Sequence, residues 1–335
     1  MHLVLLSFSV LAGAAPADFN QQWGDWKAEL DSYRLVQPRY GQPRTGSAVM
    51  IWVTEPLSAA KHVKLDHPEA AGADAVSVMK LNFIRRFKTG IYDYSLMTSV
   101  FSPVVFGNSS IAAHRPVKVT FTAQDWCGHV FQQLDVRGGE LLSQWRSYFE
   151  SESDGAERSP LAENLLLEDE LWYRLRGLTE PLAPGVYPLA PAPQSVRLSH
   201  STMVLGTVQV ARAPRPVPIK VPAGAFDTVQ WDLTLRWGPD GRQQQRRTVW
   251  IEEAAPHRIV AWEGDVPSFH ANEPSRERAE LKASIRDTYW QHNRLEDDAS
   301  EQTADPGLSG CSNVNSFAHS RVTSAALDRN PIKRA

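Results

Sequence analysis

The stretch QDWCGHVFQQLDVRGGELLSQWRSYFESE, residues 124–152, gathers the side chains of this chain that are best suited to chemistry. Its Gly138-Gly139 dipeptide predicts a two-residue hairpin turn, which places Val136 opposite Leu141. Because side chains alternate along a strand, one face of this hairpin becomes polar and the other faces the core. The polar face carries Cys127, His129, Gln133, Gln144, Arg146, Tyr148 and Glu150.

A thiol, an imidazole and a carboxylate on one face could form a hydrolase or transferase site. Cys127 would be the nucleophile, His129 would stabilise its thiolate, and Glu150 would orient the imidazole ring. The spacing weakens this interpretation, because residues two apart on a strand have Cβ atoms roughly 6.5–7 Å apart. The alternatives are a solvated sheet face and a ligand-binding groove. That groove would use Arg146, Tyr148, Gln133 and Gln144.

A second candidate site is the segment HVKLDHPEA, which holds His62, Asp66 and His67 close together. Imidazole and carboxylate groups bind metals, but this segment reads as a loop with no fourth ligand in view. A solvated loop is therefore the favoured interpretation. The chain also has no Cys-x-x-Cys pair, no glycine-rich phosphate loop and no Gly-x-Ser-x-Gly motif. No metal and no other cofactor is predicted.

Composition limits the class of protein before any motif is considered. The chain has 335 residues, of which 42% are hydrophobic and 22% charged, as is typical of a soluble globular protein. The formal net charge of −3 provides no basic field for nucleic acid, so no nucleic-acid partner is expected. The 11 Trp and 23 Pro residues favour strands and turns over a helical bundle.

The strands expected from this composition must position the candidate residues. FDTVQWDLTLRW alternates strictly, and the following Pro-Asp-Gly predicts a turn. We therefore predict a mainly β (α+β) fold: a large curved antiparallel sheet, or half-barrel, with one or two packed helices. The predicted segments are a β-rich half at 18–180 with helices near 18–31 and 160–178, a Pro-rich linker or strap at 181–195, an antiparallel meander at 196–294 and a disordered tail at 295–335.

The N-terminus, MHLVLLSFSVLAGAAPADF, resembles a signal peptide over residues 1–14, with Ala12 and Ala14 at the −3 and −1 positions of a cleavage site. Its apolar run is too short to span a bilayer, so no transmembrane segment is expected. Ala14 stands where a lipoprotein signal would have its lipidated cysteine. A periplasmic or secreted protein is predicted, in which Cys127 and Cys311 either form a disulfide or remain separate thiols.

Several longer segments of the sequence resemble an uncharacterised family of exported bacterial proteins and lipoproteins. These segments include YRLVQPRYGQPRTGSAVMIWVTE, KLNFIRRFKTGIYDYSLMTSVFSPV and QDWCGHVFQQLD, and the resemblance spans about residues 20–292. The closing meander, through VWIEEAAPHRIVAWEG, is similar to half-barrel β-proteins of the lipoprotein-carrier type. Some family members carry the label "septum formation inhibitor Maf". The resemblance implies a curved antiparallel sheet wrapped over helices.

The Maf label implies a nucleotide pyrophosphatase, but the motif of that activity is missing. Maf proteins open with a Ser-x-Ser-Pro-Arg-Arg phosphate-binding stretch, and the nearest segments here, QPRYGQPR and ARAPRPVP, lack its serines. No catalytic residues carry over from the label. The leading prediction is a non-catalytic envelope accessory or binding protein for an apolar or amphipathic ligand. Its partner would be such a small molecule or another envelope protein.

Overall fold

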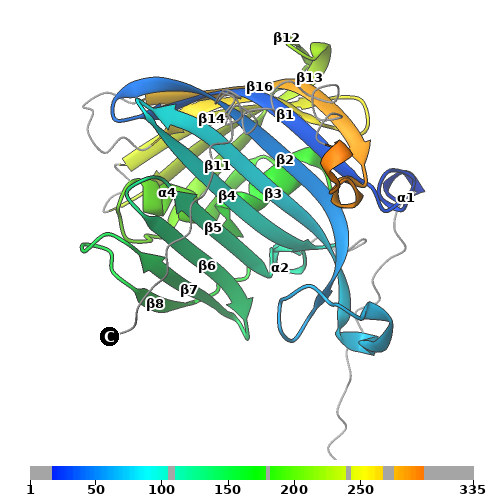
Figure 1. Cartoon of the computed structure of the whole chain (residues 1–335), viewed down its shortest axis with the longest axis horizontal. Helices are drawn as coiled ribbons and strands as arrows, with labels where there is room; N and C mark the ends of the chain where they lie inside the picture. Colours follow the sequence, from blue (N-terminus) through cyan, green and yellow to red (C-terminus); the bar gives the residue numbers. More distant parts are fainter. Residues whose placement is uncertain (1–16, 105–109, 179–181, 239–242, 267–274, 298–335) are drawn as a thin grey trace, which may run out of the picture.

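Alternating polar and apolar side chains along most of the chain form one curved sheet of 16 strands. The computed structural model describes residues 17–104, 110–178, 182–238, 243–266 and 275–297. Within them the fold is mainly β with a few short helices (Figure 1), which confirms the predicted fold class. The predicted signal peptide, nearly all of the predicted tail and the second cysteine lie outside the described residues.

The strands follow one another closely in the chain. In order they are β1 (Ala28–Arg39), β2 (Gln42–Ser58), β3 (Ala75–Thr89), β4 (Tyr92–Pro103), β5 (Lys118–Gln124), β6 (His129–Arg137), β7 (Glu140–Ser147), β8 (Gly155–Pro160), β9 (Leu166–Leu167), β10 (Gly185–Ala190), β11 (Gly206–Arg212), β12 (Val217–Val221), β13 (Gly224–Trp237), β14 (Gln243–Glu252), β15 (Ile259–Val266) and β16 (Ser275–Asp287).

The first and last strands of the described chain, β1 and β16, pair with each other in the middle of the sheet. Strands β1 to β8 form a meander on one side of β1, and β16 to β9 continue the sheet on its other side, with β12 paired to β13. All neighbouring strands are antiparallel except β9 and β10. The predicted N-terminal and C-terminal parts therefore share one sheet, through the pairing of β1 with β16.

The concave side of the sheet is filled by side chains. A short helix, α3 (Leu171–Arg176), lies inside the curve (Figure 1). Its Trp172 ring contacts Trp262 of β15 at 5.5 Å, and its Tyr173 ring contacts Trp52 of β2 at 5.1 Å. The Tyr173 hydroxyl donates to the Val100 carbonyl at 2.8 Å. Aromatic packing of this kind fills the space between α3 and the sheet.

The helix expected over 18–31 is shorter than its spacing suggests. Helix α1 (Ala17–Trp23) ends at a Gly-Asp turn, and the chain enters β1 at Ala28. Trp26 lies within the expected helix but is exposed in this turn. The strand prevails because β1 gains partners on both sides, β2 and β16, and sheet pairing outweighs the weak preference of a short isolated helix.

The long helix expected over 160–178 is also replaced by shorter elements. Strand β9 is followed by a 3-10 turn, η3 (Glu168–Glu170), and only then by α3. Gly177 ends α3 with φ of +69°, a conformation that glycine adopts readily. The three acids of η3 are buried, and arginines from α3 and β14 pair with two of them.

The Pro-rich segment 181–195 contributes regular structure rather than a separate linker. Strand β10 pairs with β11 and with β9. It is followed by helix α4 (Pro193–Leu198), in which the proline stands in the first turn. A proline is well suited to this place, since its missing N–H would have no partner in the helix. A further short helix, α2 (Ile111–His114), lies between β4 and β5.

Candidate functional site

The hairpin of β6 and β7 has the predicted register, with Val136 opposite Leu141. The pairing continues past the ends of the strands, because the Tyr148 N–H donates to the His129 carbonyl at 3.2 Å. The polar face predicted for this hairpin is the outer face of the curved sheet. The other face, with residues such as Leu134, is buried against the core.

The three candidate catalytic residues lie in solvent at one end of the outer face. Cys127, His129 and Glu150 are all exposed. The Cys127 N–H donates to Asp125 Oδ1 at 2.6 Å, and the charge of this carboxylate raises the pKa of the Cys127 thiol. Since the thiolate is the reactive form, a raised pKa opposes nucleophilic attack at neutral pH. The surroundings of Cys127 therefore do not favour the catalytic interpretation.

The four candidate ligand contacts are half-buried or exposed on the same outer face. Gln133 lies opposite Gln144. Arg146 forms an ion pair with Asp154 at 3.5 Å, away from the two amides. The ring of Tyr148 packs on the backbone of the neighbouring loop rather than on these residues. The hairpin thus brings the two glutamines together and leaves the arginine and the tyrosine directed elsewhere.

The three candidate metal ligands are not brought together. His62 is buried, and its Nδ1 lies 2.6 Å from Asp135 Oδ1 of β6. Asp66 and His67 are exposed, and His67 contacts Glu69 at 3.3 Å. Within the described ranges, no group of three His, Cys, Asp or Glu side chains is placed to hold a metal ion. His62 instead fastens the loop between β2 and β3 to the outer face of the sheet.

The inner face of the β6–β7 hairpin carries a polar pocket of about 100 Å³. At its wall Gln132 Nε2 donates to Ser143 Oγ at 2.9 Å, and both residues are buried. The pocket lies between this hairpin, the loop that follows β7 and the end of α4. It is lined by Gln132, Ser143, Trp145, Ser151, Glu152, Glu157, Arg197, His200, Ser201, Thr202 and Met203.

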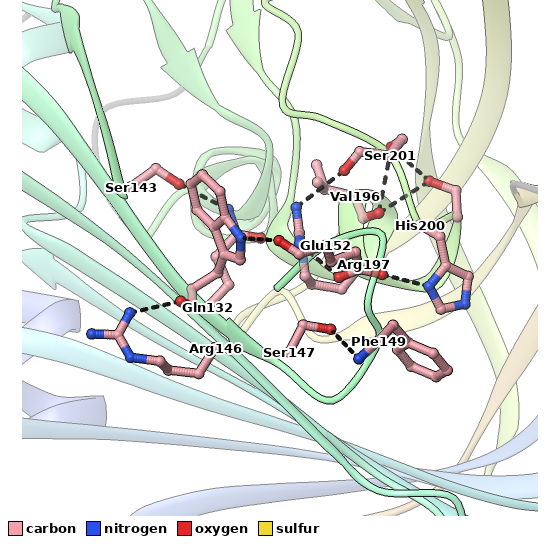
Figure 2. A network of polar contacts seen from close by, with 12 residues as sticks. Gln132, Ser143, Arg146, Ser147, Phe149, Glu152, Val196, Arg197, His200 and Ser201 are labelled. Carbon is pink, nitrogen blue, oxygen red and sulfur yellow. Dashed lines mark hydrogen bonds and ion pairs between the residues drawn. The ribbon is translucent and has the colours of Figure 1, made fainter. Parts of the chain in front are cut away.

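Glu152 joins the two sides of this pocket, as Figure 2 shows. Its Oε2 accepts from Arg197 Nη1 of α4 at 2.7 Å, and its Oε1 contacts His200 Nδ1. Its carbonyl accepts from Trp145 Nε1 at 3.1 Å. The side chains of Glu152 and Arg197 are each 4% exposed, so this ion pair is effectively buried. A buried carboxylate needs such partners to remain charged.

The end of α4 places His200 in the pocket. His200 has a φ of +50°, which turns the chain back after the helix. The hydroxyl of Ser199 donates to the Ser195 carbonyl at 2.6 Å and thereby holds the last turn of α4. The imidazole ring lies edge-on to Phe149, with centroids 4.4 Å apart. The histidine is therefore fixed between a carboxylate and an aromatic ring, which orients it without a metal.

Two buried polar atoms at the pocket wall have no hydrogen-bond partner within the described part of the chain. One is the acceptor Gln132 Oε1, and the other is the donor Nε of Arg197. Buried polar groups in native proteins are nearly always satisfied. Other buried atoms of the described residues also lack a hydrogen-bond partner, and these two are distinguished by belonging to residues that line the polar pocket beside α4.

Sequence reasoning missed Glu152, Arg197 and His200 as site residues. One signal was available: Gln132 and Ser143 interrupt the apolar face of the hairpin at neighbouring positions, which a purely structural core face would not require. No sequence pattern links this hairpin to residues some 50 positions further along. The encounter of Glu152 with α4 depends on the packing of α4 against β5 and β6, which are distant from it in the sequence.

A second polar cluster lies deeper, beneath α4. Arg247 Nη2 donates to Glu168 Oε1 at 2.8 Å. Burial, and then the adjacent Glu168 carboxylate, raise the pKa of Asp169 to about 7. Burial also raises the pKa of Glu170 to about 7, against the attraction of Arg174. These groups are enclosed, so we interpret them as interior ion pairs that support η3 and α3 rather than as a binding site.

The proteins of known structure that resemble this chain share little sequence with it. No protein-family model and no curated protein matches it, so the resemblance to the exported family stays a prediction. One similar solved structure is a beta-barrel-like protein of domain of unknown function DUF1849 from Brucella abortus, with 12% identity over 77% of this chain and 97% of that one and a TM-score of 0.44.

A second similar structure is an exported-protein candidate with a YmcC-like fold from Bacteroides fragilis. It is 11% identical, covers 77% of this chain and 95% of its own, and has a TM-score of 0.24. The fold class therefore rests on the strand order of the chain itself. The described helices are all too short or too polar to serve as membrane-spanning segments.

Proposed function

We propose that this chain is a non-catalytic binding protein of the bacterial envelope, which holds the neutral polar head of a small amphipathic molecule in the pocket between β6, β7 and α4. The observation that carries the proposal is the unmatched pair of buried atoms, Gln132 Oε1 and Arg197 Nε. A hydroxyl or an amide can donate to the first and accept from the second. Leaving both atoms unsatisfied costs on the order of 1–3 kcal/mol each.

The charges around the pocket favour a neutral head over an anionic one. Arg197 is already neutralised by Glu152, and Glu157 adds a further negative charge to the lining. A phosphate or carboxylate would meet this negative charge without a free cation to balance it. The same reasoning disfavours a nucleotide, and with it the pyrophosphatase activity that the Maf label implies.

The apolar part of the ligand would lie outside the sheet interior. The centre of the sheet is filled by α3, whereas the pocket wall includes Trp145 and Met203. Apolar side chains beside a few directed polar groups are typical of small-molecule sites. A volume of about 100 Å³ admits only a small head group. The chain of an amphipathic ligand would therefore extend from the pocket toward the adjoining loops.

Calorimetric titration below the critical micelle concentration tests this proposal with three probes: 1-monooctanoylglycerol, octyl phosphate and glycerol. We expect monooctanoylglycerol to bind at least about tenfold more tightly than octyl phosphate, a difference of ~1.4 kcal/mol. Glycerol alone should bind more weakly than the acylated probe, because it lacks the apolar contact with the pocket wall.

Matched variants on one strand provide the control. Gln132→Met removes the unmatched acceptor and should weaken monooctanoylglycerol binding about tenfold. Gln133→Met changes the neighbouring residue on the opposite face of β6 and should leave binding unchanged. The proposal fails if the unaltered chain does not bind the probe, if octyl phosphate binds more tightly, or if both variants lose binding equally. Circular dichroism verifies that each variant is folded.

Export is a separate part of the proposal. Cleavage after Ala14 would release a soluble protein that begins at Ala15. The intact mass of the protein recovered from the periplasm or the medium measures this directly. A chain that keeps residues 1–14 and remains in the cytoplasmic fraction would contradict the envelope location and leave the pocket unaffected.

A further inference from the structure

Four hairpin connections lie side by side at one end of strands β1 to β8. Strands β1 to β8 are adjacent and antiparallel, so every second connection lies at the same end of the strands. These connections are β1–β2, β3–β4, β5–β6 and β7–β8. In Figure 1 they line the left side of the sheet, beside α4. The other connections, such as the loop between β2 and β3, lie at the opposite end of the strands.

Each of these four connections presents one large apolar side chain to solvent. We call the four residues the apolar rim: Tyr40, Ile91, Trp126 and Tyr148, which are 39%, 82%, 69% and 65% exposed. Turns favour Gly, Pro, Asn, Asp and Ser for conformational reasons, so turn formation does not explain these residues. One exposed apolar residue needs no explanation, but a row at four successive tips indicates a surface with a role.

Contacts between neighbouring loops hold the apolar rim in place. The Tyr40 and Tyr94 hydroxyls are 2.7 Å apart, and the rings of Tyr92 and Trp126 have centroids 6.3 Å apart. The loop that carries Trp126 is fixed by Asp125, whose Oδ1 accepts from the backbone N–H groups of residues 127 and 128.

Gly128 allows the last member of the rim to pack on this loop. A Cβ atom at Gly128 would lie 2.5 Å from Cγ of Tyr148, so only glycine lets the ring rest on the backbone. The rim is therefore a preorganised surface, and its apolar side chains are held outward rather than free to fold back.

The shape and chemistry of the apolar rim fit a lipid surface. Its side chains project from turns, so they match a soft apolar medium better than a rigid partner. Trp and Tyr are the residues that prefer the boundary between head groups and acyl chains. Basic residues stand near the first two tips and suit lipid phosphates: Arg39, Arg44, Arg86 and Lys88, of which Lys88 forms an ion pair with Asp93 at 3.7 Å. The other two connections carry the acidic residues Asp125, Glu150 and Asp154, so the attraction to phosphates is confined to the first two tips.

We propose that the apolar rim docks the protein on a phospholipid bilayer, with the four tips inserted at the level of the head groups. The rim is continuous with the pocket, since Phe149 contacts Tyr148 at 5.6 Å and His200 at 4.4 Å. On the proposed function, an amphipathic molecule would pass between bilayer and pocket along this short path. Docking itself does not require the pocket to be occupied.

Co-sedimentation with vesicles of phosphatidylethanolamine and phosphatidylglycerol tests docking. The double substitution Ile91→Ser with Trp126→Ser should lower the partition coefficient at least about tenfold, because two inserted side chains are lost. Trp26→Ser is the matched control: Trp26 is 68% exposed but precedes β1, at the end of the strands opposite the apolar rim. Its binding should equal that of the unaltered chain.

A dye on Cys127 distinguishes insertion from adsorption by charge. In a Cys311→Ser chain, an environment-sensitive dye on Cys127 would report from the loop that carries Trp126. We expect a blue shift of its emission on vesicles, and little loss of binding in high salt. Unchanged emission, equal loss in the Trp26 variant, or sedimentation with insoluble peptidoglycan but not with vesicles would overturn the proposal. The Gln132 variant should dock normally, which separates this test from that of the pocket.

Discussion

At the scale of single residues, Gly46 shows how closely two strands of the sheet approach each other. A Cβ atom at this position of β2 would lie 2.2 Å from the Arg86 carbonyl oxygen and 2.8 Å from Phe87 Cβ on β3. Backbone atoms cannot move away without disturbing the pairing of the two strands. The glycine is therefore required by space rather than by its conformational freedom.

We predict that Gly46→Ala lowers the free energy of unfolding by ~1–3 kcal/mol, as overpacking does in other proteins. Gly185→Ala is the control, because its nearest neighbour, the Tyr187 ring, lies at an ordinary contact distance of 3.4 Å. Urea denaturation of both variants measures the difference. An equal effect at the two positions would show that β2 and β3 can adjust more than the structure indicates.

Trp231 tests the assignment of the two faces of β13. The residue is buried with Leu233 and Leu235 on the core side, as the alternation of the sequence predicts. Trp231→Ala should cost ~3–5 kcal/mol in the free energy of unfolding, the range found for buried aromatic residues. The loss is measured by chemical denaturation. Trp26→Ala, at an exposed position, should cost less than about 0.5 kcal/mol.

At the scale of elements, η3 couples stability to pH. Burial raises the pKa of Asp169 to about 7 in the folded protein, whereas the unfolded value is near 3.8. Between these values the folded state binds more protons than the unfolded state. The stability that Asp169 contributes is therefore complete at low pH and is lost as the pH rises through about 7.

Asp169→Asn should remove this dependence, because an amide stays neutral. Relative to the unaltered chain, the free energy of unfolding of the variant should rise between pH 5 and pH 8, on the order of 1–4 kcal/mol. Asp93→Asn, at an exposed carboxylate, is the control for the loss of a carboxylate as such. Denaturant titrations at several pH values provide the measurement. A variant that loses stability as the pH rises would mean that Asp169 is a charged partner of Arg247.

At the scale of the whole molecule, one sheet runs through both predicted parts of the chain. Nine residues of β1 pair with β16, and the same strand pairs with β2 along its length. Neither half can unfold without exposing the edge of β1. We expect coincident thermal transitions in far-ultraviolet and near-ultraviolet circular dichroism. Two separated transitions would show that 18–180 and 196–294 unfold independently.

The distance along the chain between interacting residues explains which features could be predicted from the sequence. The β6–β7 register follows from Gly138-Gly139 and from alternation, which act over a few neighbouring residues. The helices expected over 18–31 and 160–178 were too long, because partners distant in the sequence decided those segments. Helical spacing alone carries no information about such partners.

Local sequence patterns are enough to predict a mainly β chain, the hairpin at 124–152 and the alternating faces of β13. These properties depend on turn residues and on the two-residue period of a strand. Which polar groups meet depends on contacts between distant segments. The packing of α4 against β5 and β6 brings Arg197 and His200 to Glu152, whereas Cys127, His129 and Glu150 lie in solvent. Contacts between distant segments depend on how the whole sheet closes around α3 and α4, which no local pattern encodes.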